Sequence, residues 1–401
     1  MATKKVKSVR ARHQFYNTLG KILVRPILHL AFGFKVKGKY KIQKGERVIV
    51  LSNHQANLDP IFVEFSFNKH LIPVGTDTIC HGLRGKLLKH CFGFITKRKG
   101  ETDIQATAHM TEVVKEGGNL LFFPEGNRSY AEFQFFISPN LPAMLKNFKS
   151  TIILYNLHGG TGCYPRWKGE QRIKGNFYGE IKRVLKYDEY KDMSNEELYK
   201  IIVDNLRVFD SESGEKFHSK YRAQYLEKML FVCPKCGGVS TLKSKGVDVF
   251  CSSCGLKVEY TEDLHLKSND PDFKFHILND WYQFQKKWML NYEVKENSVI
   301  FQDRGITCYL SDPNKARRPI YEGKIILTDK ELVMGSKKFA LTKIAGSSPI
   351  SGLRFSFTYD DHQYVVVGKG RFNPLKYVLA FHKLDTKMKR EDSDRYFTLE
   401  D

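Results

Sequence analysis

The sequence lacks any uninterrupted apolar run of about 20 residues, the length that a helix needs to cross a bilayer. The nearest stretch, residues 19–34, is interrupted by Lys21, Arg25, Pro26 and His29. A secretory signal is also missing, because the N-terminus has neither an unbroken apolar core nor a small-residue cleavage site. We therefore expect a protein of a reducing compartment that meets a membrane only peripherally, from the cytoplasmic side.

Acidic residues are scarce near the N-terminus, where Glu46 is the only acid against thirteen lysines and arginines in the first 47 residues. This stretch carries +12 of the formal net charge of +21, and its apolar residues recur at helical spacing from Leu19 to Leu30. Such a basic amphipathic stretch is typical of a membrane-interface segment, although an ordinary docked helix with a solvated basic face has the same pattern. We predict that residues 1–35 lie on an anionic membrane and insert the side chains of Phe15, Tyr16, Leu23, Ile27 and Phe32.

Short apolar runs alternate with helix-like segments between residues 47 and 155. Alternation of this kind predicts βαβ units and a mostly parallel sheet with flanking helices. We therefore expect an α/β domain over residues 36–187. Two groups of polar residues, around His54 and Glu125, follow directly after predicted strands. Both groups therefore lie at the carboxyl edge of the predicted sheet, where active sites of parallel sheets are found.

The first of these groups is Ser-Asn-His-Gln-Ala-Asn-Leu-Asp-Pro at residues 52–60, directly after the apolar run 47–51. Asp59 and Pro60 favour a helix start, with Asp59 at the N-cap. Across such a strand-to-helix turn the imidazole of His54 can meet the carboxylate of Asp59. The carboxylate then holds one tautomer and raises the basicity of the imidazole, as a general base requires. The alternative is a histidine that only satisfies its hydrogen bonds in the core.

Three motifs in this part of the chain resemble the glycerolipid acyltransferases, the 1-acylglycerol-3-phosphate acyltransferase family. The segment Asn53-His54-x4-Asp59 resembles the first motif of that family. Phe-Phe-Pro-Glu-Gly-Asn-Arg-Ser at residues 122–129 resembles its second strong motif, and residues 93–98 resemble the acceptor-binding segment between them. The resemblance extends from about residue 36 to residue 167 and implies an α/β acyltransferase domain.

The resemblance also implies roles for individual residues. His54 would act as the general base and Asp59 would orient it. The planar guanidinium of Arg128 suits a phosphate group, and the residues expected to bind substrate are Asn53, Lys97, Arg98, Glu125, Gly126, Asn127, Arg128 and Ser129. Ala56 and Asn127 stand where many members have serine and threonine. These departures bear on the identity of the acceptor more than on the reaction.

Four of the eight cysteines form two Cys-x2-Cys pairs, each followed by glycine: Cys233, Cys236, Cys251 and Cys254. In a reducing compartment such pairs bind metal more often than they form disulfides. Four thiolates match a closed, tetrahedral structural zinc site. We predict a zinc ribbon over residues 231–260, reached through a helical linker at residues 188–230.

The remaining residues, 261–401, begin with an aromatic helical run around Trp281 and continue as short alternating strand-like segments. A closing helix is predicted at residues 374–382. Strands that end in one helix resemble a small β-barrel with a capping helix, of the pleckstrin-homology or GRAM type. We expect a β-rich C-terminal domain that binds lipid or peptide, or that only packs.

We therefore expect a peripheral membrane acyltransferase. By the resemblance, it moves a fatty acyl group from acyl-CoA or acyl-carrier protein to the free hydroxyl of lysophosphatidic acid, giving phosphatidic acid; glycerol 3-phosphate and other lysolipids are alternative acceptors. The rival interpretation is a non-enzymatic protein that binds anionic lipid or nucleic acid through its basic surface and zinc ribbon. Nucleic acid is the less favoured partner, because aromatic residues that stack on bases are sparse near the ribbon.

Overall fold

The chain folds into two units, and its backbone passes between them five times. The computed structural model describes residues 8–76, 82–97, 104–169, 171–311, 318–350 and 353–387. Unit 1 comprises Met1–Ser129, Ile137–Gly160 and Asn176–Phe209, and unit 2 comprises Tyr130–Phe136, Thr161–Gly175 and Asp210–Asp401. Two short segments of the predicted α/β domain therefore belong to unit 2.

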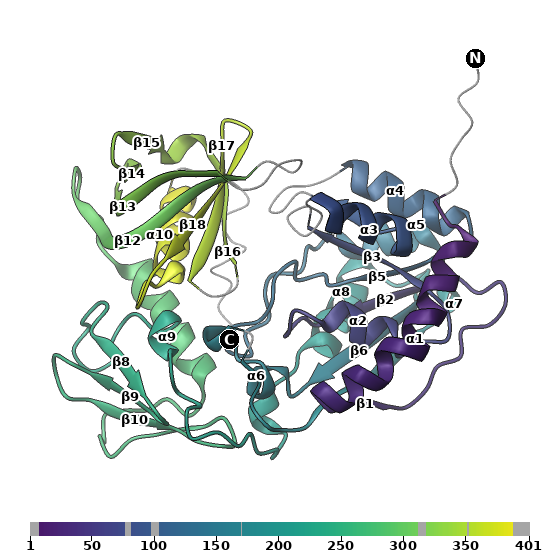
Figure 1. Cartoon of the computed structure of the whole chain (residues 1–401), viewed down its shortest axis with the longest axis horizontal. Coiled ribbons are helices and arrows are strands. Elements are labelled where there is room, and N and C mark those ends of the chain that lie inside the picture. Colours follow the sequence, from purple (N-terminus) through teal and green to yellow (C-terminus); the bar gives the residue numbers. More distant parts are fainter. Residues whose placement is uncertain are drawn as a thin grey trace. The chain divides into compact units, whose positions relative to one another are not determined.

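The mostly parallel sheet expected from the sequence lies in unit 1, with seven strands in the order β1-β7-β6-β2-β5-β3-β4 (Figure 1). The strands are β1 (Phe34–Lys37), β2 (Val48–Ser52), β3 (Leu71–Thr76), β4 (Ile95–Lys97), β5 (Asn119–Phe122), β6 (Thr151–His158) and β7 (Phe177–Leu185). Strand β7 runs antiparallel to β6, whereas the other neighbours are parallel. All residues of β2 and β5 are buried, as is typical of strands that are covered on both faces.

Apolar stripes fix the helices of unit 1 against the core. In α8, for example, Ser194 and Glu197 form a capping box, each side chain accepting from the backbone N–H of the other. Leu198, Ile202 and Leu206 follow at four-residue spacing and are buried in the core. The helices of unit 1 are α1 (Ala11–Phe32), α2 (Asp59–Glu64), α3 (Gly82–Phe92), α4 (Ile104–Lys115), α5 (Leu141–Phe148), α7 (Tyr187–Tyr190) and α8 (Asn195–Leu206), and α6 (Gly160–Cys163) starts at the boundary with unit 2.

Helix α1 turns a stripe that is largely polar inward and most of its apolar residues outward, although Leu28 is buried. His13 and Asn17 are buried, and Nζ of Lys21 donates to the carbonyl of Phe67. The exposed apolar residues of the helix are Phe15, Leu19, Ile22, Leu23, Val24, Ile27 and Leu30, of which Ile22 is 66% and Leu30 is 83% exposed. Because α1 docks with its polar side, these apolar residues are not covered by other described residues. We call this set of residues the outer face of α1.

Two residues of α1 that we expected to insert into a membrane, Tyr16 and Phe32, also contact other side chains of unit 1. The ring of Tyr16 contacts the ring of His90, and the ring of Phe32 contacts that of Phe62. Both side chains are half-buried, and their insertion into a membrane stays a prediction. Among the described residues, no helix combines the length and the apolar character needed to cross a bilayer.

Unit 2 contains the ribbon and the β-rich region. The ribbon sheet has the order β11-β10-β9-β8, with β8 (Leu242–Lys245), β9 (Asp248–Cys251), β10 (Lys257–Tyr260) and β11 (Leu266–Lys267). Helix α9 (Leu278–Asn291) precedes an antiparallel sheet of order β15-β14-β13-β12-β18-β17-β16. Its strands are β12 (Val299–Ser311), β13 (Arg318–Thr328), β14 (Glu331–Met334), β15 (Lys337–Ala340), β16 (Ile344–Ile350), β17 (Arg354–Tyr359) and β18 (His362–Gly368). Helix α10 (Pro374–Lys387) packs against β16 and β17 (Figure 1), so the β-rich region with a closing helix is confirmed.

The ribbon and the β-rich sheet share one hydrophobic core. Phe231 and Val232, which precede the first cysteine of the ribbon, are buried in the same cluster as Met289 and Phe301. The indole Nε1 of Trp281 donates to the carbonyl of Val232 at 3.0 Å. The stretches expected to form separate domains on either side of residue 260 therefore depend on each other for burial.

The segment Tyr130–Phe136 is built into unit 2. Ser211 donates to the carboxylate of Glu132 twice, from its backbone N–H at 2.7 Å and from its hydroxyl at 2.6 Å. The hydroxyl of Tyr130 donates to the carbonyl of Ile350 at 3.3 Å, across 220 residues of sequence. This segment begins directly after Ser129, yet its hydrogen-bond partners lie far later in the sequence, at Ser211 and Ile350.

The carboxyl group of Glu132 shows how completely that segment is enclosed. Burial, and after it the charge of the nearby Asp210, raise the pKa of Glu132 to about 8. Lys286 is also fully buried, and its Nζ lies 4.1 Å from the centroid of the Phe133 ring. Residues 210–401 therefore supply the burial partners of a segment that belongs, by sequence, to the α/β domain.

Candidate active site and metal centre

His54 and Asp59 meet across the turn between β2 and α2. Nδ1 of His54 lies 2.8 Å from Oδ2 of Asp59; the side chain of Asp59 is fully buried and that of His54 is 19% exposed. In the neutral imidazole, an Nδ1–H that donates to this carboxylate leaves Nε2 as the basic nitrogen. The turn therefore holds a histidine in the tautomer that a general base needs.

The carboxylate of Asp59 also organises the turn itself. Its Oδ2 accepts the backbone N–H groups of Gln55 at 2.6 Å and Ala56 at 2.8 Å. The prediction that Asp59 is the N-cap of the helix is wrong, because α2 begins at Asp59 and Leu58 occupies the cap position. The side chain instead reaches back to the preceding turn, so that one buried oxygen orients both the backbone and the imidazole of His54.

The contacts that hold the second motif against the first include a backbone hydrogen bond and a ring stack. The backbone N–H of Ser129 donates to the carbonyl of His54 at 2.8 Å. The ring of Phe123 stacks on the His54 imidazole, with centroids 4.4 Å apart and planes at 28°. Sequence reasoning gave Phe123 no role of its own, because this contact depends on the parallel pairing of β5 with β2, which the residue pattern does not specify.

The motif at residues 125–129 forms a tight turn whose side chains are mostly buried. Gly126 adopts a φ of +62°, which favours glycine, and its N–H donates to the carbonyl of Phe123 at 3.0 Å. Oδ1 of Asn127 accepts the N–H of Arg128 at 3.2 Å. The side chains of Glu125, Asn127 and Arg128 are all buried, so the turn brings a guanidinium into the interior beside the His54 turn.

Other predicted substrate-binding residues are placed differently. The side-chain amide of Asn53 is hydrogen-bonded at both ends to the backbone of Leu157 in β6. Oδ1 of Asn53 accepts the N–H of Leu157 at 2.7 Å, and Nδ2 of Asn53 donates to the carbonyl of Leu157 at 2.9 Å. Asn53 therefore ties the turn to the sheet. Lys97 is exposed at the end of β4, and Arg98 lies outside the described residues. The buried Oγ of Ser129 has no hydrogen-bond partner among the described residues, which leaves it available to a ligand.

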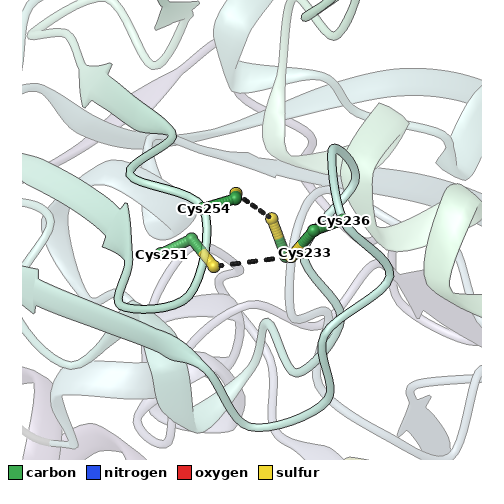
Figure 2. Close-up of side chains that lie close together, drawn as sticks. All are labelled: Cys233, Cys236, Cys251 and Cys254. Atoms are coloured by element: carbon green, nitrogen blue, oxygen red, sulfur yellow. Dashed lines mark hydrogen bonds between the residues drawn. The ribbon is translucent and has the colours of Figure 1, made fainter.

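The four cysteines of the ribbon converge on one point (Figure 2). Sγ of Cys233 lies 3.6 Å from Sγ of Cys254, and Sγ of Cys236 lies 3.7 Å from Sγ of Cys251. All four sulfur atoms are within 4.8 Å of one another. A tetrahedron with zinc–sulfur bonds of about 2.3 Å has edges of about 3.8 Å, so the cluster fits a single zinc ion.

Glycines shape the two loops that carry these cysteines. Gly237 has a φ of +68° and Gly255 a φ of +75°, a conformation that suits glycine. Their N–H groups donate to the carbonyls of Cys233 at 2.9 Å and Cys251 at 3.1 Å. Each Cys-x2-Cys-Gly stretch is thereby closed into a turn that points both sulfurs inward, and a cluster that can hold a metal is formed as expected.

Comparisons with known proteins identify relatives for part of the chain. Residues 33–155 match the family described as Acyltransferase. No curated protein matches the chain. The solved structures similar to it include the 1-acyl-sn-glycerophosphate (LPA) acyltransferase PlsC from Thermotoga maritima, with 18% identity and a TM-score of 0.41 over 49% of this chain and 76% of that one. A chain of the 8S snRNP assembly intermediate is 11% identical, with a TM-score of 0.17 over 27% of this chain and 90% of that one. The range that matches the family includes His54, Asp59 and Arg128.

Proposed function

We propose that this protein is an acyltransferase whose catalytic domain contains residues 33–155, the range that matches the family model. It moves a fatty acyl group from acyl-CoA or acyl-carrier protein to the free hydroxyl of lysophosphatidic acid, giving phosphatidic acid. The observation that carries the proposal is the His54–Asp59 pair, at 2.8 Å, joined by backbone to the motif of Arg128. A non-enzymatic lipid-binding or nucleic-acid-binding protein, the rival interpretation, is not supported, because the match is to an enzyme family.

In the proposed reaction His54 acts as the general base. Its Nε2 takes the proton of the acceptor hydroxyl while the hydroxyl oxygen attacks the thioester carbonyl carbon. The new C–O bond forms, the C–S bond breaks, and the leaving thiolate takes up the proton from the imidazolium. Asp59 keeps the ring oriented and stabilises the imidazolium, so no covalent acyl-enzyme is needed.

Arg128 is proposed to bind the phosphate of the acceptor. A guanidinium donates two parallel hydrogen bonds to phosphate oxygens, and burial strengthens such bonds because water competes less. The unpartnered Oγ of Ser129 lies in the same turn and can donate to the same group. Glu125, Gly126 and Asn127 then serve mainly to shape the turn that presents these donors.

The acceptor and donor can be identified directly by mass spectrometry of the products. We expect acylated product from lysophosphatidic acid with acyl-CoA, with acyl-carrier protein, or with both donors, and much less from glycerol 3-phosphate when the two acceptors compete. Lysophosphatidylcholine is the control, because its phosphate is a diester that also carries choline, whereas that of lysophosphatidic acid is a monoester. Preferential acylation of the control acceptor would contradict the role given to Arg128, and the absence of any acylated product would contradict the proposed function.

The metal is proposed to be zinc, held by Cys233, Cys236, Cys251 and Cys254 with no position open for chemistry. These residues lie in unit 2, whereas His54, Asp59 and Arg128 lie in unit 1. The proposed role of the ion is therefore to stabilise unit 2, and no step of acyl transfer is assigned to it.

A peripheral position on the cytoplasmic side of a membrane is also proposed. It is supported by the outer face of α1, since a row of exposed apolar side chains next to basic residues suits an anionic lipid surface. A lysophospholipid keeps its acyl chain in the bilayer, so an enzyme that uses it benefits from working at that surface.

We expect the double substitution Ile22→Glu/Ile27→Glu to weaken binding to anionic vesicles by roughly 100-fold. Burying each side chain in the acyl region contributes about 1.5 to 3 kcal/mol, and a carboxylate adds repulsion from anionic lipid. Sedimentation with vesicles measures the effect. Val299→Glu is the control, because Val299 is also an exposed apolar residue, 51% exposed, but lies in unit 2.

Activity on a soluble short-chain acceptor should be unchanged in the double variant, because neither residue belongs to the site. Activity on vesicle-embedded acceptor should fall with binding. Equal sedimentation of the double variant and the parent would place the membrane anchor elsewhere in the chain and end the proposal for α1.

A further inference from the structure

A polar cavity of about 260 Å³ lies within unit 2. It contains none of the residues assigned above to acyl transfer or to metal binding. Leu230, just before the ribbon, and Ser240 and Leu242 of the ribbon line one side of the cavity, and β12 and the turn before α10 line the other side. Three exposed basic residues line the cavity on the side of the β-rich sheet: Arg304, Lys369 and Arg371. We call these three residues the basic rim.

The backbone brings the basic rim together from separate elements. Strand β12 is bulged just after Arg304, where Gly305 has a φ of +74°. The N–H of Lys369 donates to the carbonyl of Gly305 at 3.0 Å, and Gly370, with a φ of +63°, turns the chain towards Arg371. Bulges re-aim side chains at the edges of sheets, and this one places Arg304 beside the turn that carries the other two cations.

The acidic residues at the cavity already have partners. Oδ2 of Asp303 lies 2.8 Å from Nζ of the buried Lys376 and accepts the hydroxyl of Tyr377 at 2.6 Å. The carboxylate of Glu227 accepts the hydroxyl of Ser244. Neither carboxylate is paired with a residue of the basic rim, so the rim keeps its positive charge.

Within the described residues, Arg304, Lys369 and Arg371 form no ion pair. Against Asp303 and Glu227, these three lining cations leave a formal excess of +1. Lys376, which does not line the cavity but pairs with Asp303 there, raises the excess to +2. The N-terminus of α10 adds to the positive potential, because Asn373, whose Oδ1 accepts the N–H groups of the first turn, itself lines the cavity.

We propose that this cavity binds a phosphomonoester. Arginine forks and lysine match the three terminal oxygens of such a group, and its charge of nearly −2 at pH 7 balances the excess of the cavity. The ligand is either the headgroup of a membrane lipid or a soluble phosphate compound. The proposal does not depend on the acyl-transfer reaction, because it involves only residues of unit 2.

The test uses the full chain and compares two lipids. Phosphatidylcholine vesicles carry either phosphatidic acid, whose headgroup is a phosphomonoester, or phosphatidylglycerol, a phosphodiester, at matched surface charge. Inorganic phosphate, titrated calorimetrically, is the soluble probe. The rim variant is Arg304→Gln/Lys369→Gln/Arg371→Gln, and the matched control is Lys274→Gln/Lys287→Gln/Lys295→Gln, which removes three exposed cations of unit 2 away from the cavity.

We expect the rim variant to bind phosphatidic acid vesicles roughly 100-fold more weakly than the parent, because each cation near an anionic group changes affinity about fivefold. The control variant and binding to phosphatidylglycerol should change far less. Loss of binding to inorganic phosphate as well identifies a soluble phosphate compound as ligand, whereas an effect on vesicles alone identifies a lipid headgroup. Equal losses in both triple variants, or undiminished binding by the rim variant, would overturn the proposal.

Discussion

Replacing His54 by alanine is expected to slow acyl transfer by roughly 10² to 10⁴-fold, the usual contribution of a general base. The substitution removes the nitrogen that takes the acceptor proton but leaves the turn intact, because Asp59 still accepts the N–H groups of Gln55 and Ala56. The thermal unfolding temperature should therefore change little. Turnover measured with saturating donor and acceptor tests the expectation.

A second histidine provides a matched control. His158 lies 3.0 Å from the carboxylate of Glu180 and stacks on the ring of Tyr178, much as His54 pairs with Asp59 and stacks on Phe123. His158→Ala therefore removes a similar pair from the same unit without touching the motifs. If both alanine variants lost activity equally, or if His54→Ala turned over at nearly the parental rate, the assignment of the base would be wrong.

The conservative change Asp59→Asn should also slow turnover. An amide group can donate to Nδ1, which favours the tautomer with the proton on Nε2 and removes the basic nitrogen from the acceptor. The effect should appear mainly in kcat and less in KM, because Asp59 acts through His54 and does not contact the acceptor. A change confined to KM would indicate a binding role for Asp59.

Removing the metal is expected to unfold unit 2. The binding of structural zinc by four thiolates contributes about 10 to 16 kcal/mol at neutral pH in small zinc domains, comparable with the whole stability of a typical domain, about 5 to 15 kcal/mol. Because Phe231 and Val232 belong to the same core as the β-rich sheet, the loss should spread beyond the ribbon. Cys236→Ser and treatment with a chelator should both abolish the thermal transition of unit 2.

Metal content and activity separate this structural role from a catalytic one. Freshly purified protein should contain one zinc per chain, Cys236→Ser should contain little, and Cys308→Ala should contain as much as the parent because Cys308 lies outside the cluster. During chelation, acyl transfer should fall no faster than unit 2 unfolds. Protein without bound metal, or activity lost while unit 2 remains folded, would contradict the proposal.

Much of unit 1 could be predicted from the sequence because its central strands are apolar throughout. The strand expected at residues 47–51 is β2 (Val48–Ser52) and the one at 120–123 is β5 (Asn119–Phe122), both buried along their full length. Strands β1 and β7 gave no such signal, since β1 alternates with exposed lysines and β7 is partly exposed. Strand β16 contains glycine, serine and proline residues, which do not favour strands.

The site was predictable in its chemistry more than in its contacts. The spacing of His54 and Asp59 after a strand was enough to expect their pairing, because the turn is local. The engagement of Asn53 by Leu157, 104 residues away, depends on which strand lies next to β2, and the residue pattern does not specify that order. The linker illustrates the same limit: helix α8 ends at Leu206, and residues 207–230 are mostly turns and short 3-10 helices. Their backbone bonds go to distant residues, as when the N–H of Ala223 donates to the carbonyl of Gly246 in the ribbon.

The passage of the backbone between the two units has a consequence for synthesis on the ribosome. At roughly 5 to 20 residues per second, about 10 to 40 seconds separate the emergence of Tyr130 from that of Ile350, its partner 220 residues later. Throughout this interval Phe133 and Phe135, buried in the finished protein, have no folded unit 2 to cover them. Nascent chains with such exposed aromatic residues are prone to aggregate and depend on chaperones. The N-terminal half of this protein therefore cannot finish folding ahead of the C-terminal half, and the two are completed together when the last strands have been translated.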